Sequence, residues 1–185
     1  MSLSIDIGIK NLGWSIIDAE NNIDFGIYNV DEEIVPKNIK KMGVINSRIW
    51  ILKEFINGIC DKNNINTIII EKQVNRNTIA MELMYLLVTL CSEKVGIENV
   101  IIYDPKKKFT TLKMEYDTRN KAHKKKSIEI ISRWLQENDK NNYVKLQNYD
   151  KKDDISDSIW MNLLSHSKWR SRFSDWYGSG CSTLE

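Results

Sequence analysis

The chain is poor in the residues that staple small proteins or bind zinc. Its 185 residues include three cysteines, two histidines and two prolines. Cys60, Cys91 and Cys181 are odd in number and form no C-x-x-C pair, which argues against a disulfide framework and against a zinc knuckle. His123 and His166 are too few for a His-rich metal site. The sequence therefore excludes disulfide-scaffold and zinc-ribbon proteins.

Long hydrophobic segments are also absent. No apolar run approaches the ~20 residues of a membrane span, and the first residues lack the basic and then apolar layout of a signal peptide. Hydrophobic residues make up 42% and charged residues 28% of the chain, which is ordinary for a soluble globular protein. We expect an intracellular, cytoplasmic protein with one domain at residues 1–167 and a partly disordered C-terminal tail at 168–185.

Positive charge is concentrated in one window. The formal net charge is only +2, yet residues 106–126 carry +7 and the rest of the chain carries −5. The basic residues of this window are Lys106, Lys107, Lys108, Lys113, Arg119, Lys121, Lys124, Lys125 and Lys126. Such a run is either a solvated helix face or a stripe that binds phosphates, because clustered lysines neutralise a polyanion and release its counterions.

Hydrophobic periodicity predicts an α/β protein. Five segments are typical of strands, three antiparallel and then two parallel: 2–7, 13–18, 22–30, 67–71 and 100–103. Helices are predicted after Pro36, at 78–93, around 128–135 and at 152–167, with a loop at 138–150. The first helix carries a continuous apolar seam, formed by Met42, Ile45, Ile49, Leu52, Ile56 and Ile59. This order predicts a mixed sheet with helices on both faces.

Four carboxylates stand at positions that favour a metal site. Asp6 is an unfavoured residue in an apolar strand, and Glu71 ends a continuous Ile-Ile-Ile run. Asp154 and Asp157 are three residues apart, so their carboxylates emerge on one helix face a turn apart. Taken singly, these residues could instead mark a solvated strand edge, the start of a loop and a helix N-terminus that favours negative charge.

The combination is more specific than its members. Asp6 and Glu71 would meet if their strands are parallel neighbours, because the carboxyl ends of parallel strands lie at one edge of a sheet. A final helix packed across that edge would add Asp154 and Asp157. Four oxygen ligands without His or Cys suit Mg²⁺ or Mn²⁺. Two such ions ~4 Å apart would support phosphodiester cleavage.

Three segments in order carry a resemblance to a known family. They are Asp6-Ile-Gly-Ile-Lys-Asn11, Ile70-Glu71-Lys-Gln73 and Lys151-Lys-Asp-Asp154-Ile-Ser-Asp157-Ser158. This set resembles the poxvirus Holliday junction resolvases, which belong with the RuvC-type and yeast mitochondrial resolvases in the retroviral-integrase/RNase H superfamily. The resemblance covers residues 2–165 in element order. It implies an RNase H-like mixed five-stranded sheet, in which three antiparallel strands precede the parallel ones.

The resemblance also implies an activity and its residues. The family cuts four-way DNA junctions with symmetric paired nicks that leave 5′-phosphate ends, as homodimers that use Mg²⁺ or Mn²⁺, two ions per site. Asp6, Glu71, Asp154 and Asp157 would be its metal-binding catalytic carboxylates. Lys124, Lys125 and Lys126 compete for the catalytic lysine, and we favour Lys125. As further DNA-contacting residues we predict Lys10, Asn11, Gln73, Arg76, Lys106, Lys107, Lys108, Lys113, Lys124 and Lys126.

Several alternatives remain open at this stage. Asp153 directly precedes the Asp154/Asp157 pair and could replace its first member, although Asp154 gives the spacing of three. The helix at 78–93 could form a dimer through Met81, Met84 and Tyr85, or it could be a buried core helix. A viral source would place the protein in the host cytoplasm. The alternative functions are an RNase H-like nuclease for RNA–DNA hybrids or flaps, and a non-catalytic nucleic-acid-binding protein.

Overall fold

Five strands form one mixed sheet. A computed structural model describes residues 1–20, 22–30, 33–73, 77–107, 120–165 and 167–180. The strands are β1 (Ser2–Ile7), β2 (Asn11–Ile17), β3 (Ile23–Asn29), β4 (Thr67–Glu71) and β5 (Val100–Tyr103), in the sheet order β3-β2-β1-β4-β5. β1 and β3 pair antiparallel with β2, whereas β4 is parallel to β1 and β5 is parallel to β4. The predicted mixed sheet is therefore confirmed.

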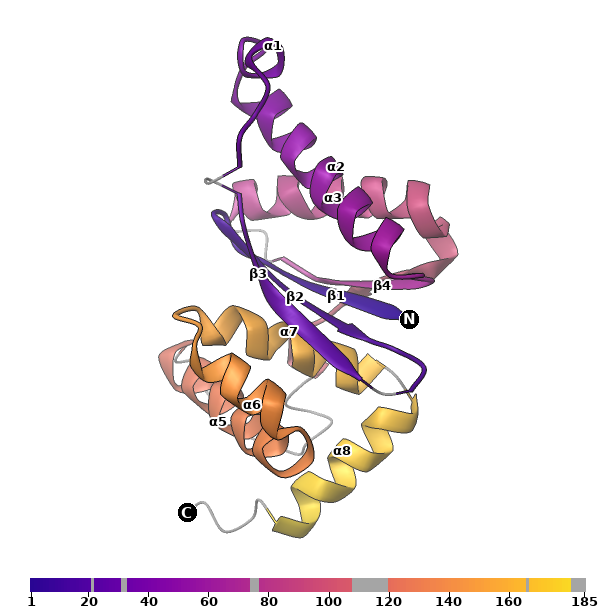
Figure 1. Cartoon of the computed structure of the whole chain (residues 1–185), viewed down its shortest axis with the longest axis vertical. Coiled ribbons are helices and arrows are strands. Elements are labelled where there is room, and N and C mark those ends of the chain that lie inside the picture. The colour runs from indigo at the N-terminus through magenta and orange to yellow at the C-terminus, as the bar shows by residue number, and fades with distance from the viewer. Residues whose placement is uncertain (21, 31–32, 74–76, 108–119, 166, 181–185) are drawn as a thin grey trace.

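Helices cover both faces of this sheet (Figure 1). One face carries α2 (Val44–Lys62) and α3 (Thr78–Val95), and the other carries α5 (Asn120–Asn138), α6 (Lys140–Gln147), α7 (Lys152–Ser165) and α8 (Ser167–Gly180). Short turns α1 (Lys37–Lys40) and η1 (Ile97–Asn99) complete the described elements. Alternation along β4 serves both cores, because Ile68 and Ile70 pack towards α2 and α3 while Ile69 packs towards α7. This is why the strand is continuously apolar.

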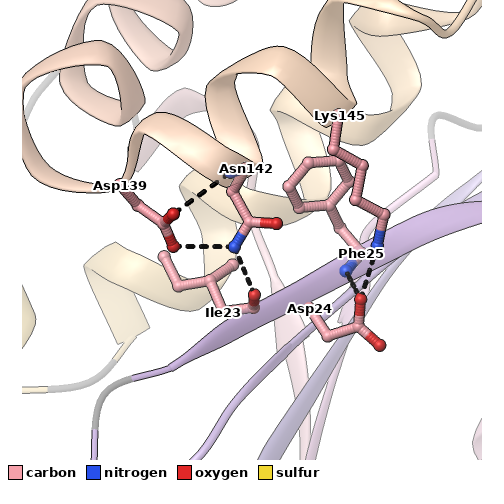
Figure 2. Close-up of polar contacts among 6 residues, drawn as sticks. All are labelled: Ile23, Asp24, Phe25, Asp139, Asn142 and Lys145. Atoms are coloured by element: carbon pink, nitrogen blue, oxygen red, sulfur yellow. Dashed lines mark hydrogen bonds and ion pairs between the residues drawn. The ribbon is translucent and has the colours of Figure 1, made fainter.

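The prediction of a loop at 138–150 is wrong, because residues 140–147 form α6. Asp139 caps the helix by accepting a hydrogen bond from the backbone N–H of Asn142 (3.1 Å). Figure 2 shows how α6 is fastened to β3: Asn142 Nδ2 donates to the carbonyl of Ile23 at 2.6 Å, and Lys145 pairs with Asp24 at 2.6 Å. The asparagines that indicated a loop therefore serve as tertiary hydrogen-bond donors and helix formers in this context.

Helix α8 was not predicted from the sequence. Its aromatic residues pack on α5 and α7, with Trp169 edge-on to Trp134 (ring centroids 5.3 Å apart) and Phe173 edge-on to Trp160 (5.7 Å). Both Trp169 and Phe173 are buried. The division of the chain into a nuclease domain at 1–167 and a tail at 168–185 stays a prediction.

The predicted first helix is broken at Gly43, whose φ of 105° is in the left-handed region that favours glycine. α1 precedes this break and α2 follows it. The apolar seam is only partly covered, because Leu52, Ile56 and Ile59 are buried whereas Met42, Ile45 and Ile49 are exposed. Within the described part of the chain, no helix combines the length and apolar character needed to cross a membrane.

Candidate active site

Helix α7 lies along strand β1 with matched repeats. Ser2 Oγ donates to Oδ1 of Asn162 at 2.6 Å, and Ser4 Oγ donates to the carbonyl of Ser158 at 2.7 Å. Two residues of strand span about 6.6 Å and four residues of helix about 6 Å, so each two-residue step on β1 matches a four-residue step on α7. The next step along both elements leads to Asp6 on β1 and to Asp154 in the first turn of α7. The buried serines and Asn162 therefore set the register that brings the two carboxylates to one edge of the sheet.

Gly13 allows this close approach. It is the cross-strand partner of Asp6 on β2. A Cβ atom at Gly13 would collide with the backbone carbonyl of Asp154. The first turn of α7 can therefore rest on β2 only because position 13 has no side chain. Sequence reasoning missed this residue, since nothing local to Gly13 reveals which helix will cover it.

Glu71 lies beside Asp6 at the same edge. β4 is parallel to β1 and pairs Ile70 with Ile5, so Glu71 follows at the carboxyl end where Asp6 also stands. Glu71 is two residues beyond Ile69, which places both on the α7 face. Gln73 donates from Nε2 to Oε2 of Glu71 at 3.1 Å. Gln73 thus orients a carboxylate, in addition to the DNA contact predicted for it.

Asp157 is held by α5. Ser127, which is buried, donates from Oγ to Oδ1 of Asp157 at 2.6 Å. This bond engages one lone pair of the Asp157 carboxylate, which lies three residues from Asp154 on the same helix. Ser127 was not predicted, although it follows the three competing lysines directly in the sequence.

The carboxyl group of Asp154 has a strongly shifted pKa. Burial raises the pKa of Asp154 to about 6, and the negative charge of Asp153 adds to the rise. Lys124 and Lys151 oppose it, whereas Asp157 contributes further in the same direction. A cation placed among these carboxylates would favour the ionised form and relieve their repulsion. This is the electrostatic state expected of a metal ligand without its metal.

Lys124 pairs with the neighbouring Asp153. Its Nζ lies 2.5 Å from Oδ2 of Asp153. The hydrogen bond to Asp153 raises the pKa of Lys124 despite partial burial, and the charges of Asp154 and Asp6 raise it further. Burial alone would raise the pKa of Asp153, but the hydrogen bond and charge of Lys124 outweigh it and lower that pKa. Asp153 is therefore engaged by a lysine, whereas Asp154 lies against Gly13, the cross-strand partner of Asp6.

The other predicted DNA-contacting residues gather around the same edge. Lys10 lies in the turn between β1 and β2 and Asn11 begins β2, where the Gly8 N–H donates to the Asn11 carbonyl at 2.9 Å. Gln73 follows β4, and Lys106 and Lys107 follow β5, whose carboxyl end shares this edge. Lys125 is exposed and Lys126 half-buried on α5. Arg76, Lys108 and Lys113 lie outside the described residues.

The donor set fits a hard divalent cation by type. All four candidate ligands offer carboxylate oxygens, which Mg²⁺ and Mn²⁺ prefer. Among the described side chains, however, no three His, Cys, Asp or Glu residues are close enough together to hold an ion as they stand. Asp6 and Glu71 stand at the carboxyl ends of neighbouring parallel strands, and the first turn of α7 with Asp154 lies against β2 at the same edge.

Comparison with known proteins identifies one matching family and several solved structures with a similar fold. The sequence matches the family described as Poxvirus A22 protein over residues 1–166. No curated protein matches the chain at a significant level.

Solved structures with the same fold come from yeast, a poxvirus and a bacterium. The yeast mitochondrial Holliday junction resolvase Ydc2 is 16% identical with a TM-score of 0.62, covering 96% of this chain and 83% of its own. The fowlpox virus resolvase, solved with substrate Holliday junction DNA, is 22% identical with a TM-score of 0.57, covering 92% and 97%. Thermus thermophilus RuvC in complex with Holliday junction substrate is 11% identical with a TM-score of 0.53, covering 96% of both chains. These likenesses confirm the predicted RNase H-like fold.

Proposed function

We propose, since the chain belongs to the Poxvirus A22 protein family, that it is a divalent-metal-dependent endonuclease that resolves four-way DNA junctions. The observation that carries this proposal is the packing of the first turn of α7, with Asp154, on Gly13, the cross-strand partner of Asp6, at the edge where Glu71 also ends its strand. The fold shared with resolvases from three sources supports it. One of those relatives, the fowlpox virus resolvase, is described with junction DNA as its substrate.

The proposed metal ligands are Asp6, Glu71, Asp154 and Asp157, with two Mg²⁺ or Mn²⁺ ions per site. When bound, such ions activate a water and neutralise the charge on the leaving oxygen in phosphodiester hydrolysis. The protein's own contribution is to fix the ligands. Ser127 holds one oxygen of Asp157, and Gln73 holds one oxygen of Glu71. Each hydrogen bond restricts the orientation of a carboxylate that would bind an ion.

One lysine of α5 belongs to the proposed site. The sequence favoured Lys125 over Lys124 and Lys126, and that choice stays a prediction. The structure supports Lys124 for the same role, because its charge is stabilised by Asp153, Asp154 and Asp6 together. A lysine in that position remains protonated near a scissile phosphate and can stabilise negative charge there. Substitution of Lys124 and of Lys125 separates the two assignments.

We further propose that the enzyme acts as a homodimer. A symmetric dimer offers two equivalent sites, which matches the two-fold symmetry needed for paired nicks in a four-way junction. Helix α3 is the proposed interface. Tyr85 is 58% and Ile79 40% exposed on it, and Met81 is half-buried, whereas Met84 lies in the core. The helix thus has both a buried face and an outer apolar face.

The substrate class is tested by comparing cleavage of four nucleic-acid substrates of related sequence. A labelled four-way junction, a flap, an RNA–DNA hybrid and a linear duplex are incubated with Mg²⁺ and with EDTA. We expect symmetric paired nicks in the junction, only with metal, and no cleavage of the duplex. Preferential cleavage of the hybrid or the flap would show that the protein is an RNase H-like nuclease and not a junction resolvase. Junction binding without cleavage in both Mg²⁺ and Mn²⁺ would make the protein a binding protein.

A further inference from the structure

A basic and apolar projection stands at one end of the molecule. We call residues 34–49 the tip; they include α1 and the first turns of α2, which project beyond the sheet in Figure 1. The tip contains no Asp or Glu and four basic residues, Lys37, Lys40, Lys41 and Arg48. The three lysines are exposed, and α1 buries none of its residues. The tip itself therefore carries only positive charge, while Asp31, Glu32 and Glu33 directly precede it in the sequence.

The tip also exposes an unusual amount of apolar surface. Ile34 is 89%, Ile45 71%, Val44 68%, Met42 62% and Ile49 36% exposed. Scattered apolar residues on a surface need no explanation, but these are contiguous along one projecting segment. Ile45 and Ile49 prolong the stripe that packs in the core farther along α2. Folding buries the half of this seam formed by Leu52, Ile56 and Ile59 and leaves the half formed by Met42, Ile45 and Ile49 exposed.

The tip begins near the same edge of the sheet as the proposed metal ligands and projects away from it (Figure 1). β3 is parallel to β1 because both pair antiparallel with β2. The chain leaves β3 at that edge, where the Val30 N–H donates to the carbonyl of Lys10 at 2.8 Å. Lys10 follows Asp6 by four residues in the turn after β1. The tip thus begins beside the proposed site, on the α2 and α3 side of the sheet.

We propose that the tip contacts DNA next to the branch point of the junction, an inference that rests on the proposed function. Its lysines contact flanking phosphates, and Met42, Val44 and Ile45 pack against bases that lack a stacking neighbour. Apolar wedges with basic neighbours are a recurring means of binding unstacked bases. A partner with acidic charge complements the tip, whereas the tip of a second copy would oppose four positive charges with four more.

Two double variants test this contact against a matched control. Met42→Ala/Ile45→Ala removes apolar surface, Lys40→Ala/Lys41→Ala removes charge, and Val144→Ala on α6 (58% exposed) is the control. Affinities are measured in EDTA for a labelled junction and a duplex of the same sequence, with 2-aminopurine at the branch point. Thermal unfolding and molecular mass in solution are measured for every variant.

We expect the apolar variant to bind the junction about fivefold more weakly or worse, because it loses apolar surface that would be buried against the bases, while its duplex affinity changes little. Its 2-aminopurine signal on binding should also fall. The lysine variant should weaken binding to both DNAs and lower the salt dependence of affinity. The control should match the wild type in each measurement.

Three results would overturn the inference. If the apolar variant binds the junction as tightly as the wild type and still cleaves it, the tip does not contact the DNA. The proposed function would remain valid in that case. A fall in molecular mass with unchanged affinity makes the tip a contact between copies. A wild-type protein that neither binds nor cuts the junction removes the proposed function, and the inference falls with it.

Discussion

The hydroxyl of Ser127 on α5 donates a 2.6 Å hydrogen bond to Oδ1 of Asp157 on α7. Ser127 is buried at this contact, so water cannot easily replace it. The bond connects the helix that carries the basic residues with the helix that carries two of the proposed metal ligands. It therefore ties the orientation of Asp157 to the position of α5.

Ser127→Ala should lower junction cleavage about tenfold, since loss of a residue that orients a metal ligand typically costs 10–100-fold. The affinity for junction DNA should change little. Cleavage rates as a function of Mg²⁺ concentration check this, because a poorly oriented ligand raises the concentration of metal required. An unchanged rate at every metal concentration would remove Ser127 from the site.

Gly13→Ala should disrupt the site through packing. The added Cβ collides with the carbonyl of Asp154, and overpacking of this kind costs about 1–3 kcal/mol of unfolding free energy. Displacement of the first turn of α7 should also abolish cleavage. Denaturant unfolding and the cleavage assay check the two effects.

Gly58→Ala is the matched control for this substitution. Gly58 lies on α2 and a Cβ there meets no atom within 4 Å. The change should stabilise the protein by about 0.5–1 kcal/mol, because alanine restricts the unfolded chain and favours the helix. A Gly13→Ala protein as stable and active as Gly58→Ala would contradict the packing account.

The raised pKa of Asp154 predicts a pH dependence of stability without metal. Burial raises the pKa of Asp154 to about 6, above its value in the unfolded chain. Between the two values the folded state holds more protons, so this group stabilises the fold at low pH and its contribution is lost as pH rises to about 6. Asp154→Asn should therefore gain stability relative to the wild type over this range.

Denaturant unfolding in EDTA at several pH values between 4 and 7 checks that difference. Mg²⁺ should narrow it by stabilising only the protein that keeps the Asp154 carboxylate. A constant difference between the two proteins across the pH range would mean that Asp154 titrates normally.

Lys124→Ala should reduce cleavage about a hundredfold, the typical loss when one donor that stabilises developing charge is removed. Lys125→Ala is its matched control on the same helix and should retain most activity, because Lys124 pairs with Asp153 whereas no contact of the Lys125 side chain with the carboxylates is observed among the described residues. Single-turnover cleavage of saturating junction separates catalysis from binding. A larger loss of cleavage in Lys125→Ala than in Lys124→Ala would instead identify Lys125 as the catalytic lysine.

The strands and the edge that carries the carboxylates could be predicted from the sequence. Alternation along β1 and the β-branched run of β4 are local signals, whereas the parallel pairing of these two strands is a condition that the sequence leaves open. The spacing of Asp154 and Asp157 likewise follows from helix geometry alone. These features required no knowledge of distant contacts.

Features that depend on tertiary contacts could not be predicted. Helix α6 is held by Asn142 and Lys145 against β3, and in isolation its asparagine-rich sequence favours a loop. The contact between Gly13 and Asp154 depends on where α7 crosses the sheet. The preference for Lys124 over Lys125 depends on the rotation of α5 about its axis. In each case the deciding partner lies far away in the sequence.

The most direct test of the account is cleavage of a labelled four-way junction by Asp154→Asn, with Glu129→Gln as an exposed carboxylate control on α5. The account predicts that the wild type and Glu129→Gln make paired, metal-dependent nicks, while Asp154→Asn binds the junction but does not cut it. Metal-dependent cleavage by Asp154→Asn at the wild-type rate would contradict the proposed site.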